Sequence, residues 1–470
     1  MLKASLAGLA ILLVLAVGDA RASTFAKQDV VIPMDDGVSI AASLYLPEAS
    51  PPADGWPAIV LLHGFGGSRL ELNAFVESYG AALQTYALLT IDARGHGASG
   101  GLIGVAGPRD VADVRAIRNW LASRADVSDA KIAAWGISYG GGTALNSLAA
   151  GVPWGAVVSF QGWADLEAAL MPQGLVKSGV VSGLAATMPR ERQDPALVGL
   201  FAAALAGNTR AAQLWARERS SLSRLDTVTT PVFMAQGRRD FLFGLDQGTI
   251  AFQRLRGPKV LYLGLHGHSP STFPAADTGF LVDKTRAWLD CQLLGQGCDR
   301  DTSTVYLAPE SFTGQVVRRR ALPPVSPTFV TFPGVTTFAQ RGKAVRTSAR
   351  LQKAVEIFGS PTVDVGIGAR GGWSRLVAVL TARTPQGREV VVSTGGVPTQ
   401  NGASKLTIRM IGQATYVPRG SRLTLTLASS STAQGSGNPV YLDLPMRQTA
   451  RVRVGPAVLK LPSLRNPVTR

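Results

Sequence analysis

The stretch Lys131-Ile-Ala-Ala-Trp-Gly-Ile-Ser138-Tyr-Gly-Gly-Gly142 decides the fold that we predict for this chain. An apolar, partly β-branched run leads straight into Gly-x-Ser-x-Gly, and a helical pattern over residues 143–150 follows. This order of strand, tight turn and helix is typical of a nucleophile elbow. The glycines around Ser138 allow a turn that is too tight for side chains, and the helix N-terminus favours developing negative charge. We therefore predict that Ser138 is a nucleophile.

On both sides of this stretch, strand and helix patterns alternate over residues 28–300. The helical pattern is clearest over Asp110–Arg124, where apolar residues are spaced for one buried face. Strand–helix alternation implies a parallel sheet covered on both faces, so we predict an α/β fold. The apolar runs suited to buried parallel strands are 59–62, 87–91, 132–135, 156–160, 232–235 and 260–263.

A serine nucleophile needs a base to take its proton and an acid to orient that base. In this kind of fold the acid and then the base follow the serine along the chain. Asp240 follows one predicted strand, and the loop after the next strand contains His266 and His268. We predict Asp240 as the acid and His268 as the base. Asp246 is the alternative acid, but it lies where the next helix should begin and is better interpreted as a surface or capping carboxylate.

The oxyanion hole can also be placed. One predicted donor is the backbone N–H of Tyr139, the residue after the nucleophile. The second is the N–H of Phe65 or Gly66, in a His63-Gly-Phe-Gly-Gly loop that resembles the HGxxG of lipases and esterases. His63 is expected to be structural.

A third loop, Asp92–Ser99, ends at the same predicted edge of the sheet. We expect it to shape the floor of the site through hydrogen bonds of Asp92 and Arg94. Direct catalysis by His96 is not expected.

Residues 162–225 interrupt the alternation with an Ala/Leu/Arg-rich helical stretch between two strands. Ligands bind at this edge of open α/β sheets. We therefore predict a helical cap that covers the site and governs specificity. Its Trp163 and Leu170 are the expected substrate-binding residues, and His266 is expected to line the same pocket or to hydrogen-bond its own loop.

After residue 300 the pattern changes to alternating runs separated by Gly/Ser/Pro turns, which predicts a β-sandwich. The charge changes at the same point: residues 301–470 hold 22 Lys/Arg and 6 Asp/Glu, whereas residues 1–300 hold 25 of each. We therefore predict a catalytic domain over 23–300 and a second domain over 301–470. The basic domain could bind an acidic envelope surface, or its charge could simply favour solubility; nucleic acid is not expected as a partner.

The first 22 residues read as a secretory signal peptide. A basic start is followed by an apolar run from Ala4 to Val17 and by Ala20-Arg-Ala22, a small-x-small cleavage site. The run is shorter than the roughly 20 residues that span a bilayer, and no later stretch is apolar for long enough. No cysteine follows it, so a lipoprotein anchor is not expected. We predict a secreted or periplasmic protein without a transmembrane segment.

The only two cysteines, Cys291 and Cys298, close the last predicted helix of the first domain. In an exported protein a disulfide is the natural interpretation. A continuous helix would hold the two Cα atoms about 10.5 Å apart along its axis, which is too far to bridge. The pair therefore requires the helix to end near Gly295, with the chain folding back.

Composition excludes several classes of protein. With 2 Cys and 4 His in 470 residues, a disulfide scaffold, a multi-thiolate metal centre and a His-rich metal site are not expected. The 52 Gly and 28 Pro follow no collagen-like period. We expect neither a metal nor an organic cofactor.

Together, these motifs resemble the X-prolyl dipeptidyl peptidase and cocaine-esterase-like serine hydrolases of the α/β-hydrolase superfamily. The resemblance rests on Trp135-Gly-Ile-Ser-Tyr-Gly-Gly141, the D-x-R-G-x-G-x-S loop from Asp92, the late Asp and His loops and the β-rich C-terminal part. In that family the last loop has the form Gly-x-x-x-His, which Gly264 to His268 fits and His266 does not. Gly267 adds the backbone freedom to swing His268 towards Ser138.

The resemblance implies an α/β-hydrolase domain with a helical cap, a jelly-roll-like domain packed against it, and cleavage of an ester or amide through an acyl-serine. One feature departs from the family, which often supplies an oxyanion donor from a tyrosine hydroxyl in the early loop. This chain has Phe65 in that loop, so we expect two backbone donors.

Three functional hypotheses follow. The first is an acyl esterase or amidase acting on small-molecule or polymeric substrates. The second is an Xaa-Pro dipeptidyl peptidase, which needs an anionic pocket for the peptide's amine; Asp165 and Glu167 are the candidates. The third is a non-catalytic binding protein, against which the complete set of Ser138, Asp240 and His268 argues.

Overall fold

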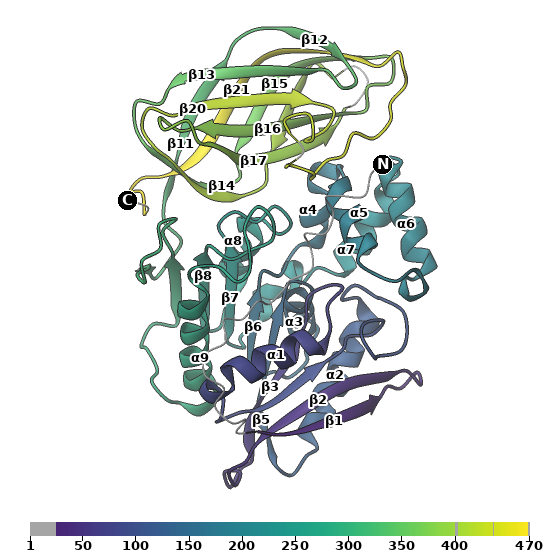
Figure 1. Cartoon of the computed structure of the whole chain (residues 1–470), viewed down its shortest axis with the longest axis vertical. Coiled ribbons are helices and arrows are strands. Elements are labelled where there is room, and N and C mark those ends of the chain that lie inside the picture. Colours follow the sequence, from purple (N-terminus) through teal and green to yellow (C-terminus); the bar gives the residue numbers. More distant parts are fainter. Residues whose placement is uncertain (1–24, 400–402, 436, 469–470) are drawn as a thin grey trace.

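The computed structural model describes residues 25–399, 403–435 and 437–468. The predicted signal peptide, residues 1–22, lies outside the described residues. Two domains are visible in Figure 1: a sheet flanked by helices and, above it, a domain built from strands alone.

The first domain is built on a ten-stranded sheet in the order β1-β2-β4-β3-β5-β6-β7-β8-β9-β10. Strands β3 to β9 run parallel to their neighbours in this order, and the edge strands β1, β2 and β10 pair antiparallel. The strands are β1 (Phe25–Pro33), β2 (Ser39–Pro47), β3 (Trp56–Leu62), β4 (Ala87–Ile91), β5 (Val127–Ile137), β6 (Ala156–Phe160), β7 (Val232–Gly237), β8 (Lys259–Gly264), β9 (Ser303–Leu307) and β10 (Val317–Arg319).

Helices cover both faces of this sheet, which explains why its strands are continuous apolar runs. Alternate residues of β3 face opposite cores: Val60 packs in one and Leu61 in the other. Helices α2 (Pro108–Ala122), α3 (Tyr139–Ala149) and α8 (Leu245–Arg254) pack on one side, and α1 (Arg69–Tyr79) and α9 (Thr278–Leu294) on the other. A short η1 (Gly80–Ala82) follows α1. All six predicted parallel strands lie in this sheet, so the predicted α/β fold is confirmed.

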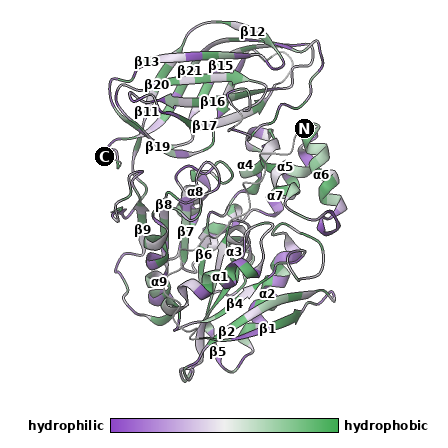
Figure 2. Ribbon diagram, in the orientation of Figure 1, coloured by the Kyte–Doolittle hydropathy of each residue, from purple (hydrophilic) through white to green (hydrophobic). Residues whose placement is uncertain are grey.

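A helical segment between β6 and β7 lies over the carboxyl ends of the strands (Figure 1). It contains the most continuously hydrophobic helix of the chain, α6, which is green in Figure 2. We call residues 162–228 the cap. Its elements are α4 (Leu166–Leu170), η2 (Pro172–Gly174), α5 (Ser178–Ala186), η3 (Arg190–Arg192), α6 (Pro195–Leu205), α7 (Arg210–Glu218) and η4 (Leu222–Thr227).

The second domain, which we call the β-domain, contains two antiparallel sheets that enclose one core. One sheet has the order β18-β15-β21-β14-β19, with β11 and β12 also paired to β21, and the other has the order β13-β20-β16-β17. The strands are β11 (Val325–Phe332), β12 (Thr336–Ala339), β13 (Lys343–Arg350), β14 (Val355–Gly359), β15 (Thr362–Arg370), β16 (Arg375–Arg383), β17 (Glu389–Pro398), β18 (Lys405–Arg409), β19 (Gln413–Val417), β20 (Arg422–Ala428) and β21 (Arg451–Leu464).

The boundary between the domains differs from the predicted one at residue 300. Strands β9 and β10 extend the first sheet to Arg319, so the chain enters the β-domain between Arg319 and Val325. The charge step misplaced the boundary because β9 is buried and β10 is a short basic edge strand.

Cys291 and Cys298 form a disulfide with their Cα atoms 4.8 Å apart. Helix α9 ends at Leu294, and Gly295 follows in the left-handed conformation, with φ 68°. This left-handed turn brings the second cysteine back to the helix end, as the disulfide prediction requires.

Among the residues that the structure describes, no helix is long and apolar enough to cross a membrane.

Candidate active site

Ser138 sits on a sharp turn between β5 and α3, with φ 55° and ψ −112°. A non-glycine residue with positive φ is strained by about 1–3 kcal/mol and persists only where its surroundings enforce it. Two glycines make the turn possible: a Cβ on Gly136 would lie 2.2 Å from the Gly140 backbone, and one on Gly140 would lie 2.1 Å from the Leu62 carbonyl oxygen. The turn therefore holds the Ser138 hydroxyl at the carboxyl edge of the sheet.

The structure brings the predicted nucleophile, base and acid into one hydrogen-bonded chain. The Ser138 Oγ lies 2.8 Å from His268 Nε2, and His268 Nδ1 lies 2.7 Å from Asp240 Oδ2. Asp240 follows β7 and His268 follows β8, so neighbouring parallel strands deliver both to the edge that carries Ser138. This geometry is that of a nucleophile, its general base and the acid that orients the base.

Asp240 is fully buried yet well supplied with donors. Its Oδ1 accepts the N–H groups of Leu242 and Phe243, each at 2.8 Å, and its Oδ2 accepts the His268 N–H at 3.0 Å. Burial acts to raise the pKa of Asp240, but the His268 ring and these N–H groups outweigh it and hold the pKa below the ordinary value. The carboxylate is therefore ionised at neutral pH. It keeps the proton of His268 on Nδ1 and leaves Nε2 free to accept the Ser138 proton.

The predicted oxyanion donors lie in the loop after β3 and at the start of α3, both at this edge of the sheet. Within residues 25–399, 403–435 and 437–468, the backbone N–H groups of Tyr139, Phe65 and Gly66 have no hydrogen-bond acceptor. The Gly140 N–H donates to the His63 carbonyl at 3.0 Å and so ties the Phe65 loop to the start of α3. These N–H groups can therefore stabilise a negatively charged oxygen.

His63 and His96 lie behind the site. His63 makes hydrogen bonds through both ring nitrogens, to the Gly64 carbonyl (2.7 Å) and the Ala93 N–H (3.0 Å), and burial lowers its pKa. The His96 ring stacks on Tyr139 with 5.4 Å between centroids, and burial lowers its pKa to about 4. Both rings support the loops around the nucleophile.

The loop from Asp92 is fixed by its own ion pairs. Asp92 accepts hydrogen bonds from Arg69 and from the Ala98 N–H, and Arg94 pairs with Asp113 at 2.6 Å. These contacts hold the loop in place beneath the site. The side chains of Asp92 and Arg94 do not line the cavity beside Ser138.

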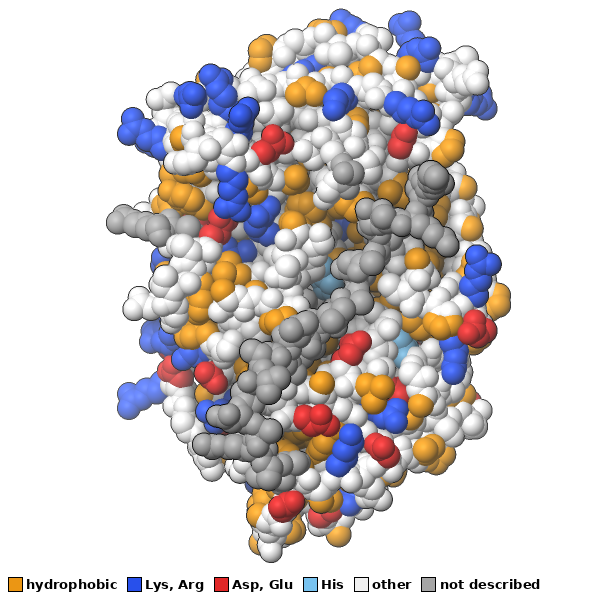
Figure 3. All heavy atoms as spheres, in the orientation of Figure 1, with side chains coloured by type: hydrophobic (Ala, Val, Ile, Leu, Met, Phe, Trp, Pro, Cys, Tyr) orange, Lys and Arg blue, Asp and Glu red, His pale blue; other side chains and the backbone are white. Residues whose placement is uncertain are grey.

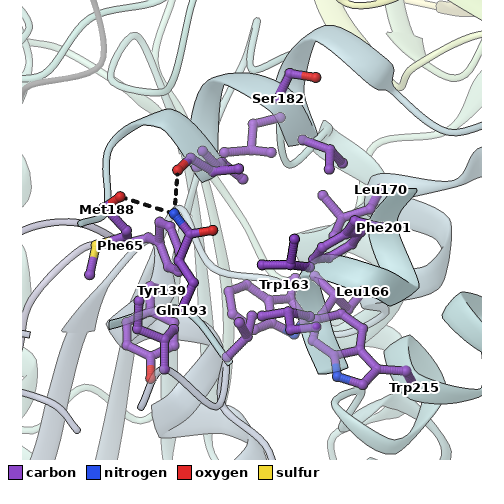
Figure 4. Close-up of a pocket in the computed structure, with 18 of the residues that line it drawn as sticks. Phe65, Tyr139, Trp163, Leu166, Leu170, Ser182, Met188, Gln193, Phe201 and Trp215 are labelled. Carbon is purple, nitrogen blue, oxygen red and sulfur yellow. Dashed lines mark hydrogen bonds between the residues drawn. The ribbon is translucent and has the colours of Figure 1, made fainter. Parts of the chain in front are cut away.

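A cavity of about 290 Å³ opens beside Ser138 under the cap (Figure 4). None of its lining side chains is charged. Gln193, the largest polar one, donates to the carbonyls of Ala185 and Met188, each at 3.0 Å. The lining residues are Phe65, Ile103, Val105, Ser138, Tyr139, Trp163, Leu166, Leu170, Val181, Ser182, Leu184, Ala185, Met188, Gln193, Leu197, Val198, Phe201, Ala202, Leu205, Trp215, Leu242 and Phe243.

Two of the three predicted substrate-binding residues, Trp163 and Leu170, line this cavity. His266 does not, and its placement in the pocket was wrong. Its ring is fully buried beside Tyr262, with 5.8 Å between centroids, and its Nδ1 lies 3.8 Å from Asp277. Its backbone pairs with Thr272.

Sequence reasoning missed several lining residues, among them Phe201, Trp215 and Phe243 (Figure 4 labels the first two). For Phe201 and Trp215 the available signal was an aromatic residue in an apolar cap, but the direction each faces depends on how the cap helices pack. Phe243 lies outside the cap, in the loop after β7. It also missed Asp110, which accepts the Tyr139 hydroxyl at 3.1 Å and whose pKa is raised to about 6 by burial.

Asp165 and Glu167, the candidates for binding an amine, lie outside the Ser138 cavity. They line a separate cavity of about 440 Å³ between the cap, α8 and the β-domain, whereas Leu166 and Leu170 of the same helix line the Ser138 cavity. Glu167 is moreover paired with Arg217. Within the described part of the chain, no group of three or more His, Cys, Asp or Glu residues could hold a metal ion.

Residues 36–270, half of the 470, match the family model of X-Pro dipeptidyl-peptidase (S15 family). Over 156 residues the chain is 31% identical to the quorum-quenching protein AidA of Acinetobacter baumannii, covering 32% of this chain and 48% of AidA. Over 121 residues it is 33% identical to an uncharacterized protein of Mycobacterium tuberculosis, covering 26% and 40%. The matched part thus spans about half of these relatives or less.

Solved structures match over both domains. A CocE/NonD family hydrolase from Staphylococcus aureus superimposes with a TM-score of 0.72 at 13% identity, covering 94% of each chain. An aminopeptidase from a Thaumarchaeota archaeon gives 0.66 at 14%, covering 94% of this chain and 97% of that one, and an alpha-amino acid ester hydrolase gives 0.63 at 17%, covering 95% and 98%. At these identities the likeness shows that the two-domain fold is shared.

Proposed function

Because the chain belongs to the X-Pro dipeptidyl-peptidase (S15) family and is therefore a serine hydrolase, we propose that it is an esterase that cleaves esters carrying an apolar chain. The observation that supports this choice most directly is the uncharged cavity beside Ser138. Its volume of about 290 Å³ is near the lower end of the range, roughly 300–1,000 Å³, in which proteins bind small molecules.

The proposed reaction has two halves. Ser138 Oγ attacks the ester carbonyl carbon while His268 Nε2 takes the hydroxyl proton, and the negative charge on the carbonyl oxygen is stabilised by the N–H groups of Tyr139 and of Phe65 or Gly66. The carbon–oxygen bond to the alcohol then breaks, and His268 returns the proton to the leaving oxygen. Water, deprotonated by His268, hydrolyses the acyl-Ser138 and restores the enzyme.

A dipeptidyl peptidase is the alternative within the same family. Its substrate brings a charged amine close to the scissile bond, and that amine needs a carboxylate or another acceptor once it leaves water. The Ser138 cavity contains no carboxylate, and Asp165 and Glu167 line the other cavity. These two observations favour an ester with an uncharged chain over a peptide with a free N-terminus.

The test compares p-nitrophenyl esters of increasing acyl length with Xaa-Pro p-nitroanilides. We expect kcat/KM to rise from acetate to a medium-length acyl chain and to be lower for every Xaa-Pro anilide. A higher kcat/KM for an Xaa-Pro anilide would contradict the esterase proposal and favour the peptidase. A polymeric ester is compared in the same panel.

Labelling with a fluorophosphonate tests the nucleophile without assuming a substrate. We expect covalent modification of Ser138 in the wild type and none in Ser138→Ala. An unlabelled wild type would instead favour the non-catalytic binding protein.

Export and the acidic partner stay predictions. The Cys291–Cys298 disulfide suits an oxidising compartment outside the cytoplasm. Figure 3 shows many Lys and Arg side chains over the β-domain, which would favour an acidic surface. Cell fractionation of the chain with and without residues 1–22 tests export. Binding of the protein to anionic against neutral vesicles tests the acidic partner surface.

A further inference from the structure

The loop that carries Asp240 is held from the β-domain. We call residues 238–245 the acid loop. Gly412 and the first two residues of β19 each make one hydrogen bond to it. The Ala414 N–H donates to the Arg238 carbonyl (2.7 Å), Gln413 Nε2 donates to the Asp240 carbonyl (3.0 Å), and the Gly412 carbonyl accepts the Leu245 N–H (3.0 Å). Both ends of the acid loop, and Asp240 between them, are therefore hydrogen-bonded to one segment of the β-domain, residues 412–414.

Of these three hydrogen bonds, only the one from Gln413 is made by a side chain. Gln413 and Asp240 are both 0% exposed, and they lie 173 residues apart in the sequence. In this dry environment water cannot replace a lost donor, so the Asp240 carbonyl depends on the Gln413 amide. The neighbouring strand β14 adds Glu356, which pairs with the buried guanidinium of Arg238 at 2.5 Å.

The path of the acid loop determines where the Asp240 carboxylate points. Its Oδ1 is held by the N–H groups of Leu242 and Phe243, which belong to the same loop, and its Oδ2 faces His268. A shift of the Asp240 backbone would therefore move the carboxylate against the imidazole. Orientation errors of this kind at an acid–base pair lower kcat rather than substrate affinity.

We propose that Gln413 is a positioning residue for the Asp240–His268 pair, so that the β-domain is a working part of the active site. This inference rests on the proposed roles of Ser138, His268 and Asp240 in an acyl-serine mechanism. Gln413 touches no substrate: it acts through the backbone of Asp240.

The test is Gln413→Met, which keeps the length of the side chain and removes the N–H donor. We expect kcat on the best ester to fall about 10- to 100-fold with KM within about twofold, because the loss falls on the acid–base pair. Fluorophosphonate labelling of Ser138 should slow by a similar factor.

Gln340→Met is the matched control. Gln340 also lies in the β-domain and also donates to a main-chain carbonyl, that of Leu444 at 3.0 Å, but its contacts are all within that domain. We expect it to lower Tm without changing kcat on the best ester or the labelling rate. Gln413→Leu, which is also apolar and has no N–H donor, repeats the test if the Met variant does not fold.

The labelling rate separates the two possible failures. A wild type that does not label would defeat the proposed function itself. A wild type that labels, with Gln413→Met labelling equally fast and hydrolysing the best ester with unchanged kcat, would overturn the positioning role and leave Gln413 as a stabilising contact.

Discussion

At the scale of single residues, two histidines of one loop have entirely different surroundings. His268 contacts Ser138 and Asp240, and its ring packs edge-on against Phe243 with 5.3 Å between centroids. His266 is buried, and neither of its ring nitrogens has a hydrogen-bond partner in the described residues. Of the two, only His268 is within hydrogen-bond distance of Ser138, as the proposed proton transfer requires.

We predict that His268→Ala lowers kcat by about 10³-fold or more, because a serine hydroxyl without its base is a weak nucleophile. His266→Ala should cost less than about 10-fold in kcat and act mainly on Tm, since it leaves a cavity beside Tyr262. Ester turnover and thermal melts of the two variants give the answer. An active His268→Ala paired with an inactive His266→Ala would reverse the assignment.

Asp110 gives a second prediction at this scale. It lies in the first turn of α2, where it accepts the Tyr139 hydroxyl and the Gly107 N–H (3.0 Å). Burial raises its pKa from 3.8 to about 6 in the folded state. Between these two values the folded chain binds more protons than the unfolded chain, so the Asp110 contribution to stability falls as pH rises from about 4 to about 6.

Asp110→Asn removes this titration. We expect the Tm of the variant, relative to wild type, to increase from pH 4 to pH 6 and then to level off. Asp283→Asn, which changes an exposed carboxylate of α9, serves as the control. A difference between Asp110→Asn and wild type that stays constant from pH 4 to pH 8 would contradict the assignment.

At the scale of elements, the cap supplies most of the lining of the Ser138 cavity. Helix α4 and its N-cap residue lie between two cavities: Leu166 and Leu170 line the apolar one, whereas Asp165 and Glu167 line the other one. Helix α4 follows β6 closely in the chain, so it lies at the edge of the sheet that carries Ser138. Substrate preference should therefore respond to cap residues independently of the acid–base pair.

We predict opposite effects for two substitutions at Leu170. Leu170→Ala enlarges the cavity and should shift the preferred p-nitrophenyl ester to a longer acyl chain, whereas Leu170→Phe should shift it to a shorter one. Leu214→Ala, on a side chain of α7 that is 54% exposed, is the matched control and should leave the preference unchanged. Equal loss of kcat/KM across all esters, with a lowered Tm, would mean that Leu170 only stabilises the cap.

At the scale of the whole molecule, three parts of the chain meet at the acid loop. The cap contributes Lys177, whose buried ammonium donates to the carbonyls of Phe241 (2.9 Å) and Leu242 (3.0 Å) and whose pKa burial lowers to about 8. The β-domain contributes Gln413 on the other side. These contacts bury polar groups of both parts. Separating the cap or the β-domain from the acid loop would break the hydrogen bonds and leave buried donors and acceptors unpaired.

We predict that the two domains unfold in a single transition. Glu356→Gln, which leaves the buried charge of Arg238 without its counter-charge, should lower the Tm of that transition for both domains together, by an amount corresponding to about 3–5 kcal/mol. Glu389→Gln, at an exposed position of β17, is the control. Calorimetry that resolves two separate transitions, or limited proteolysis that frees a fully active first domain, would contradict this prediction.

The local features were legible from the sequence for a physical reason. The turn at Ser138 needs small residues at Gly136 and Gly140 whatever surrounds it, and an apolar run such as Ala156–Phe160 suits a strand that is buried on both faces. These rules allowed the sheet, the elbow and the order of Ser138, Asp240 and His268 to be predicted.

What only the tertiary structure decided depends on contacts between residues far apart in the chain. Three features depend on how packed elements face one another. They are the surroundings of His266, the lining of the cavity by four cap helices, and the hydrogen bond from Gln413 to the acid loop. The domain boundary belongs here too, because β9 joins the sheet by pairing with β8 rather than by any local signal. Backbone geometry and hydrophobic periodicity are properties of neighbouring residues and are written in the sequence directly, whereas side-chain partners depend on the packing of the whole chain.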